Sequence, residues 1–422
     1  MTADLALSSS LQAWIMSAMP LGAACGLLTA GALGDTFGRR RTFVGGLWLT
    51  VVSSIAAALA TDGAFLIVMR IVQGLGSAAI MACGLGLLSQ VYQGLALRRA
   101  AGIWAAALGG GVAAGPIIAS LLLFIGGWAG IHWLITVASA ILGYAATKGL
   151  PQDTSRGGRI DLIGSILLMV GLACLLSAMI EVRVGTPVVV ASLFGAGVLV
   201  IGGFVAIELR LPHPLVMLDL FRYADFTGAT IAAFASGAGV LALMSLVPTV
   251  LVRGLGMSPL SAAFVLLGWS GITVLSALGA RYLPVRFSSR QLVIGSILGC
   301  AVGQSLLLAI DANTGWSAAL PGLVVAGICN GILNASLGHE AVRTVPAERA
   351  AMGSAVNNTA RYLGSALGIA LVSVLISTRT NEGFFAGWHE AVVASAMLSL
   401  IGVIAMAVLS RRDARASAGA AD

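Results

Sequence analysis

The stretch GALGDTFGRRR, residues 31–41, separates two apolar runs near 12–34 and 42–60. Each run is long enough to cross a lipid bilayer as a helix, which takes about 20 apolar residues. The stretch between them carries one carboxylate, at Asp35, and ends in three consecutive arginines. We therefore predict two membrane-spanning helices joined by a short basic loop.

The composition of the whole chain indicates a membrane protein. Of 422 residues, 59% are hydrophobic and only 9% are Asp, Glu, Lys or Arg, whereas soluble proteins carry roughly a quarter charged residues. Such a composition cannot supply the polar shell of a water-soluble domain, which excludes a soluble enzyme. The cysteines have no metal or redox spacing, and we interpret them as small core residues. They are Cys25, Cys83, Cys174, Cys300 and Cys329.

Thirteen apolar runs follow one another along the chain. They lie near 12–34, 42–60, 64–92, 101–126, 128–148, 160–182, 187–209, 226–252, 259–282, 291–311, 317–341, 353–377 and 388–410. Lipid offers backbone groups no hydrogen-bond partner, so runs of this length should be helical. We predict an all-α polytopic membrane protein with about thirteen visible transmembrane helices.

Basic residues are distributed unevenly between the two sets of alternate loops. One set carries 18 Lys and Arg residues, the other carries three, and two arginines lie inside the runs. Cytoplasmic loops are enriched in Lys and Arg, so the richer set and the C-terminus are predicted to be cytoplasmic. The same alternation places the N-terminus outside, although residues 1–10 do not resemble a signal peptide. This N-terminus and the odd number of spans suggest a missing first helix.

A weak internal repeat divides the chain. The stretch 76–102 recurs as 327–353, and each copy is a Gly-rich helix leading into a basic loop and a second Gly-rich helix. Six helices plus an additional pair would separate equivalent points by this distance, which predicts two bundles. The predicted parts are an N-terminal bundle of five visible helices at 1–150, an inserted helix pair at 151–210, a linker at 211–225, a C-terminal six-helix bundle at 226–410 and a cytoplasmic tail at 411–422.

Residues 31–41 resemble the cytoplasmic-loop signature of the major facilitator superfamily, G-x-L-x-D-x-x-G-R-[RK]-[RK]. Here Gly31 would let a neighbouring backbone approach, Gly38 would allow a tight turn, and Asp35 can hold an arginine or a helix N-terminus. The resemblance implies a gating role for this loop. The residues concerned are Gly31, Asp35, Gly38, Arg39, Arg40 and Arg41.

Two further motifs follow in the order of that family. Arg70, Gln73 and Gly74 are similar to its R-x-x-Q-G motif. A later stretch is similar to its antiporter motif, G-x8-G-x3-G-P-x2-G, with Ala119 in place of the final Gly. Such glycines allow close helix packing, and the proline bends its helix. The matching residues are Gly102, Gly111, Gly115 and Pro116.

Other segments resemble the fourteen-helix drug:proton antiporter branch of this superfamily. They are residues 11–14, 208–226, 345–346 and 357–361. The resemblance covers about 3–410 and departs at 128–129, where Trp-Ala replaces the usual Trp-Arg. It implies a two-bundle major facilitator-type fold, proton-coupled export of small organic compounds or drugs by alternating access, a bacterial inner membrane location, and the absence of the family's first helix.

A proton-driven transporter needs a titratable group inside the membrane, usually Asp or Glu. None of the 16 acidic residues falls at the centre of a predicted run. Arg70 and Arg361 do, and each needs a partner or an aqueous cavity; in the resembling family an Asp of the first helix can pair with the motif arginine. Either this chain begins too late and lacks that helix, or it is complete and is defective or coupled through another group, such as His132 or Asp35.

Polar and aromatic residues on the cavity-lining helices of the resembling family are candidate substrate contacts, because aromatic faces can hold cationic or planar organic compounds. The candidates are Trp14, Trp104, Trp269, Asn330, Asn334, Asn357 and Asn358.

The histidines form no H-x-x-x-H or HExxH pattern, and we predict no enzyme. We expect a monomer in the lipid bilayer that binds a small-molecule substrate and protons, with no nucleic acid, metal or cofactor. The alternatives are an importer or uniporter of a small metabolite, and a truncated, inactive transporter.

Overall fold

A computed structural model of the chain describes residues 9–151, 161–181, 186–211, 218–280, 287–343, 345, 350–377 and 383–419. These residues form helices and no strand. They contain eleven helical stretches that are long and apolar enough to cross a membrane, and a shorter apolar helix at Ile163–Met179. The stretch Ala107–Gly149 covers two of the predicted runs, so each of the thirteen runs falls on a helix. The prediction of an all-α polytopic protein is confirmed.

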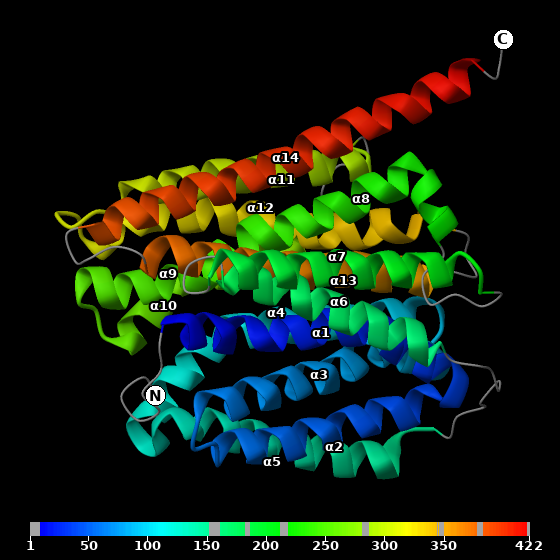
Figure 1. The fold of residues 1–422 in the computed structure, drawn as a ribbon, viewed down its shortest axis with the longest axis horizontal. Coiled ribbons are helices and arrows are strands. Elements are labelled where there is room, and N and C mark those ends of the chain that lie inside the picture. The colour runs from blue at the N-terminus through cyan, green and yellow to red at the C-terminus, as the bar shows by residue number, and fades with distance from the viewer. Residues whose placement is uncertain are drawn as a thin grey trace. The chain divides into compact units, whose positions relative to one another are not determined.

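Contacts between helices divide the chain into two units. The first unit comprises residues 1–105 and 121–218, and the second comprises 106–120 and 219–422. The helices up to the end of the first unit are α1 (Ser9–Phe37), α2 (Arg39–Ala58), α3 (Gly63–Val91), α4 (Gly94–Gly126), α5 (Gly130–Gly149), α6 (Leu162–Glu181) and α7 (Pro187–Glu208). Within this unit α3 packs against both α1 and α2, and α2 also packs against α5 (Figure 1).

Glycines bring the helices of the first unit into backbone contact. A Cβ atom at Gly74 of α3 would overlap the carbonyl oxygen of Met19 on α1, and one at Gly22 would overlap the carbonyl oxygen of Ile71. Transmembrane helices gain most of their association energy from such close van der Waals packing, since lipid tails compete for apolar side chains. The α1–α3 contact therefore depends on the absence of side chains at these positions.

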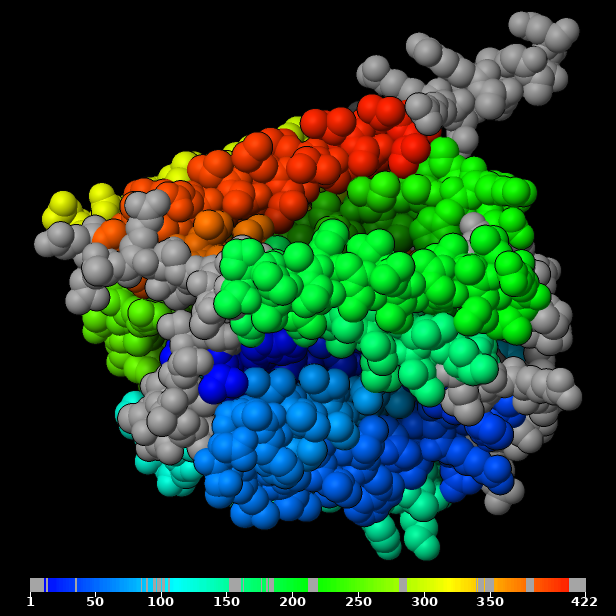
Figure 2. Space-filling model, in the orientation of Figure 1, coloured from blue at the N-terminus to red at the C-terminus, as the bar shows by residue number. Residues whose placement is uncertain are grey.

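Figure 2 shows α7 at the surface of the face drawn, and several large apolar side chains of this helix are exposed. Val188 and Leu199 are each 76% exposed. The helix begins where the hydroxyl of Thr186 accepts a hydrogen bond from the Val189 amide and Pro187 occupies the first turn, an arrangement typical of a helix start. An apolar outer face of this kind is suited to lipid.

Besides residues 106–120 of α4, the described residues of the second unit include seven α-helices and a π-helical segment. They are α8 (Ala224–Ala235), the π-helix Ser236–Leu241, α9 (Ala242–Leu255), α10 (Pro259–Gly279), α11 (Ser289–Leu306), α12 (Leu320–Arg343), α13 (Ala350–Ser377) and α14 (Phe384–Gly419). The predicted tail at 411–422 continues α14 as far as residue 419. In the predicted linker, residues 212–217 lie outside the described residues, and 218–222 form a short 3₁₀ helix.

The last turn of α8 and the π-helix that follows it pack against α13 through reciprocal glycine contacts. A Cβ atom at Gly237 of the π-helix would overlap the backbone oxygen of Arg361 on α13, and one at Gly364 would overlap the oxygen of Phe234. π-helical turns are rare and are often found at functional sites. This contact fixes the backbone of α13 at the point where it carries Arg361.

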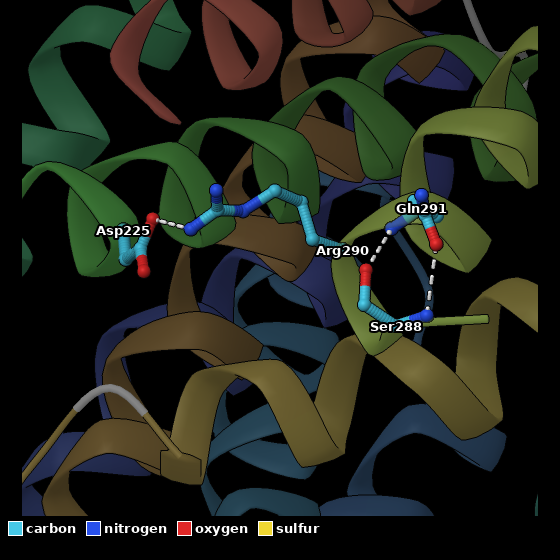
Figure 3. Close-up of polar contacts among 4 residues, drawn as sticks. All are labelled: Asp225, Ser288, Arg290 and Gln291. Carbon is cyan, nitrogen blue, oxygen red and sulfur yellow. Dashed lines mark hydrogen bonds and ion pairs between the residues drawn. The ribbon is translucent and has the colours of Figure 1, made fainter. Parts of the chain in front are cut away.

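An ion pair joins the first turn of α11 to the first turn of α8. Figure 3 shows that the Arg290 guanidinium reaches the Asp225 carboxylate, with both side chains about a quarter exposed. Ser288 and Gln291 form a capping box beside it, with hydrogen bonds of 3.2 Å from the Gln291 amide to the Ser288 hydroxyl and 3.0 Å in return. The cap determines where α11 begins. It therefore also determines the position of Arg290 in the first turn.

We expect Asp225→Asn to lower the free energy of unfolding by about 1–3 kcal/mol, because it leaves a part-buried arginine without its counter-charge. The control is Asp219→Asn. Its carboxylate lies 3.7 Å from Arg222, and the two side chains are 76% and 84% exposed, so its loss should cost about 0.5 kcal/mol or less. Thermal unfolding in detergent micelles measures both variants. Equal losses of stability in the two would contradict the assignment.

Candidate functional site

The arginine motif forms a helix junction. Residues 31–37 belong to α1 and 39–41 to α2, so the predicted loop is reduced to Gly38. Gly38 has φ 109°, a backbone conformation that favours glycine. Gly31 was expected to permit a close backbone approach, but no described atom lies within 4 Å of the place where its Cβ would be. The side chain of Asp35 lies outside the description.

Two of the motif arginines connect α2 to neighbouring helices. The Arg40 Nη2 atom donates a hydrogen bond to the backbone oxygen of Thr147 in the last turn of α5, where helix carbonyls lack partners and a positive charge is favourable. The Arg39 guanidinium lies against Gly86 of α3, in space that any Cβ there would occupy. The junction therefore links α2, α3 and α5 within the first unit.

Arg70 is a charged, part-buried residue in the middle of α3, in the first unit. Its Nε atom donates a 2.7 Å hydrogen bond to the backbone oxygen of Ile15 on α1. One turn along α3, Gln73 is 2% exposed and donates to the Ser54 hydroxyl at 2.8 Å. His132 on α5 is 3% exposed, and its Nδ1 atom has no hydrogen-bond partner among the described residues. Arg70 forms no ion pair with a described carboxylate.

The antiporter-motif helix differs from expectation. Gly102, Gly111 and Gly115 lie in α4, but no described atom comes within 4 Å of a Cβ at Gly111 or Gly115. The close packing predicted for these two glycines is therefore not found. The close approach occurs instead at Gly109, where a Cβ would lie 2.8 Å from a methyl carbon of Val274 on α10. Gly109 lies outside the motif, so the motif did not predict this contact.

Pro116 of α4 lines a cavity of about 260 Å³ within the second unit. Two other prolines, Pro248 of α9 and Pro259 of α10, line the same cavity. Beside it, the Ser120 hydroxyl lies 2.7 Å from the Pro116 oxygen and 3.2 Å from the Pro259 oxygen, both of which can accept its hydrogen bond. The hydroxyl thus connects α4 to the start of α10.

In the second unit, Arg361 is a charged residue that lies within an apolar span. Its Nη1 atom donates to the side-chain oxygen of Asn334 at 2.9 Å, and its Nη2 atom donates to that of Asn358 at 3.3 Å. The guanidinium carbon lies 5.7 Å from the centre of the Tyr362 ring, within the range of a cation–π contact. The Nε atom is buried and has no hydrogen-bond partner among the described residues.

Further polar side chains lie near Asn334 on α12 and on the neighbouring helix α10. Asn330, one turn earlier on α12, donates to the Thr273 hydroxyl at 3.4 Å, and Thr273 lies one turn from the buried Trp269 on α10. The Trp269 Nε1 atom and the Asn330 side-chain oxygen have no hydrogen-bond partner among the described residues. We call this set the polar stripe. Its members are Trp269, Thr273, Asn330, Asn334, Asn358 and Arg361.

The structure divides the predicted cavity residues into three groups. Trp269, Asn330, Asn334 and Asn358 belong to the polar stripe. Asn357 instead donates at 3.0 Å to the backbone oxygen of Ala229 on α8. In the first unit, Trp14 is part-buried on α1, and the Trp104 ring packs on Gly84 of α3.

The stripe offers hydrogen-bond donors and acceptors at membrane depth. Its residues lie in the candidate spans Pro259–Gly279, Trp316–Gly338 and Gly353–Ile376. Among the described residues no group of three or more His, Cys, Asp or Glu side chains could hold a metal ion. Chemically, the stripe can bind a polar organic solute by hydrogen bonds and charge.

The family model described as Major Facilitator Superfamily matches residues 1–369 and 230–422. The chain is 30% identical over 395 residues to the puromycin resistance protein pur8 of Streptomyces alboniger, covering 91% of this chain and 77% of that protein. It is 29% identical over 386 residues to the tetracenomycin C resistance and export protein of Streptomyces glaucescens, covering 90% and 71%. Over 406 residues it is 27% identical to the multidrug efflux pump LfrA of Mycolicibacterium smegmatis, covering 95% and 80%.

Among solved structures, the human organic anion transporter MFSD10 has a similar fold. The two chains superpose with a TM-score of 0.59 at 14% identity, covering 94% of this chain and 83% of the other. At this identity the likeness concerns the fold alone.

Proposed function

Because this chain belongs to the Major Facilitator Superfamily, we propose that it exports small organic compounds across the bacterial plasma membrane, in exchange for protons, by alternating access. We assign it to the fourteen-helix drug:proton antiporter branch, as a monomer with its C-terminus in the cytoplasm. The relatives whose names describe export and resistance support the direction of transport. The membrane-spanning character of the chain supports a transporter over a soluble binding protein.

The polar stripe is the single observation that carries this proposal. It places one cation and several unsatisfied polar atoms inside apolar spans, where an ionisable group is costly and usually functional. A solute that supplies the missing hydrogen bonds would recover part of that cost. We therefore assign substrate binding to the polar stripe.

Proton exchange is assigned to the first unit. Gln73 and His132 are buried in this unit, Arg70 is part-buried, and an imidazole ring such as that of His132 can gain and lose a proton. Separate sites for substrate and proton are sufficient for antiport, provided that both bias the same conformational equilibrium.

The helix junction at Gly38 is assigned the gating role. It is the one non-helical residue between α1 and α2, and Arg39 and Arg40 connect the junction to α3 and α5. A junction of one residue can transmit the movement of one helix to its neighbours without a long loop absorbing it. Asp35 would add a carboxylate to this junction, which can hold an arginine or a helix N-terminus.

Inverted membrane vesicles test the proposal directly. We expect vesicles that contain the protein to accumulate at least one of puromycin, tetracenomycin C and ethidium faster than vesicles without it, and to lose this uptake when nigericin collapses the pH gradient. Radiolabel or fluorescence measures uptake. Protein-dependent uptake that persists without the gradient would contradict proton coupling, and the absence of uptake for all three compounds would contradict export of this class.

A further inference from the structure

We propose that the polar stripe selects substrates that carry an anionic oxygen group, such as a carboxylate or a phenolate, and that Arg361 binds this group. The inference rests on the proposed export function and names the chemical class of its substrate. It is drawn from the charge, the geometry and the unsatisfied atoms of the stripe.

The charge balance of the stripe is incomplete. Arg361 lies within the span Gly353–Ile376, where a charged side chain is expensive unless it is paired or hydrated. Its partners are two neutral amide oxygens, of Asn334 and Asn358, and the Tyr362 ring. No described carboxylate forms an ion pair with it. The net charge of the described stripe is therefore positive, and an anionic ligand would neutralise it.

The geometry leaves part of the guanidinium available. An arginine has five N–H donors in a planar fork that matches the two oxygens of a carboxylate. Asn334 and Asn358 each accept one hydrogen bond, and the buried Nε–H has no partner among the described residues. The residue as a whole is part-buried, whereas its Nε atom is fully buried, so a ligand would approach the terminal nitrogens.

The surroundings hold Arg361 in position before a ligand arrives. Its backbone oxygen lies against Gly237 of the π-helix, and Asn334 and Asn358 hold two of its terminal nitrogens. A binding group that is already ordered loses less entropy when the ligand binds. Trp269 and Asn330 add a buried indole N–H and a buried amide oxygen, neither of which has a hydrogen-bond partner among the described residues.

Three fluorescent probes with one aromatic skeleton and different charges test the assignment. They are 9-anthracenecarboxylate, 9-anthracenemethanol and 9-anthracenemethylammonium. Binding to the full chain in detergent micelles is measured by fluorescence anisotropy. We expect wild-type protein to bind the carboxylate about 10-fold or more tightly than the alcohol, and the ammonium most weakly.

Two variants remove the anion site in different ways. Arg361→Gln deletes the cation. Asn334→Asp keeps the guanidinium and supplies a carboxylate at the position from which Asn334 now accepts its 2.9 Å hydrogen bond. Both should lose the preference for 9-anthracenecarboxylate over 9-anthracenemethanol, so that the two probes bind within about twofold of each other. Arg222→Gln is the matched control, because that arginine is 84% exposed and lies outside the stripe; it should behave as wild type.

Asn334→Asp tests the anion assignment even where Arg361→Gln does not fold, because it keeps the part-buried arginine and gives it a charged partner. Equal affinity of the wild-type protein for all three probes would overturn the anion assignment, as would a retained carboxylate preference in Asn334→Asp. Neither result would affect the proposed export function, which the vesicle measurement tests separately with puromycin, tetracenomycin C and ethidium.

Discussion

Replacing Gly74 with alanine is expected to destabilise the protein by about 1–3 kcal/mol or more, the cost of overpacking a close contact. The new Cβ atom would overlap the carbonyl oxygen of Met19 and lie 2.8 Å from the amide nitrogen of Ala23 and 2.9 Å from the Cα of Gly22. All three neighbouring atoms belong to the backbone of α1, so no side-chain rotation can relieve the clash. Helices α1 and α3 would have to separate, which loses packing along their length.

The control for this variant is Gly45→Ala on α2, where no described atom lies within 4 Å of the new Cβ. A Gly to Ala change inside a helix normally stabilises it by about 1 kcal/mol. The two variants should therefore change stability in opposite directions. Thermal unfolding in detergent and the yield of monodisperse protein measure both. A Gly74→Ala protein as stable as Gly45→Ala would refute the backbone contact between α1 and α3.

The fold could be predicted from the sequence largely because lipid removes alternatives. A run of about 20 apolar residues has few stable structures in a bilayer other than a helix, and all thirteen runs fall on helices. Local details were less predictable. The run 226–252 gave no sign of the π-helix Ser236–Leu241. Its Gly237 contacts the backbone of α13 and its Gly239 contacts that of α14, so we infer that its geometry depends on partners far away in the sequence.

The candidate site was only partly predictable, because sequence identifies polar residues but not the direction in which they point. Asn357 and Asn358 are adjacent, yet Asn357 donates to α8 and Asn358 accepts from Arg361. Neighbours on a helix are about 100° apart, so two adjacent asparagines rarely face one partner. Thr273 was missed, although it lies one turn from Trp269, because threonines inside helices commonly bond to their own backbone.

Some motif glycines make the close helix contacts that the motifs predict, and others do not. At Gly74 the motif glycine has a clear structural reason, since a side chain there would enter the backbone of α1. At Gly31, Gly111 and Gly115 the described structure gives no such reason. Close contact depends on the distance to a second helix, which the residues of one helix do not determine. A motif glycine therefore predicts close packing only where an opposing backbone is also known.

Arg70→Gln is expected to reduce export at least about 10-fold and to remove its dependence on the pH gradient. The Arg70 guanidinium is a fixed, part-buried cation in the middle of α3, in the first unit. It donates to the Ile15 oxygen at 2.7 Å and acts electrostatically on the His132 ring. A fixed charge changes the relative free energies of the protonated and unprotonated forms of any group nearby. Removing it should therefore uncouple proton exchange from transport.

Two comparisons separate this role from a purely structural one. Arg70→Lys keeps the positive charge but loses the planar fork, so it should retain part of the response to the gradient that Arg70→Gln loses. Binding of 9-anthracenecarboxylate should remain within about twofold of wild type in both variants, because the polar stripe belongs to the second unit and Arg70 to the first. Uptake into inverted vesicles at a series of imposed pH gradients measures the coupling. Arg70→Gln vesicles whose export rate still rises with the gradient as in wild type would rule out Arg70 as part of the proton-exchange site.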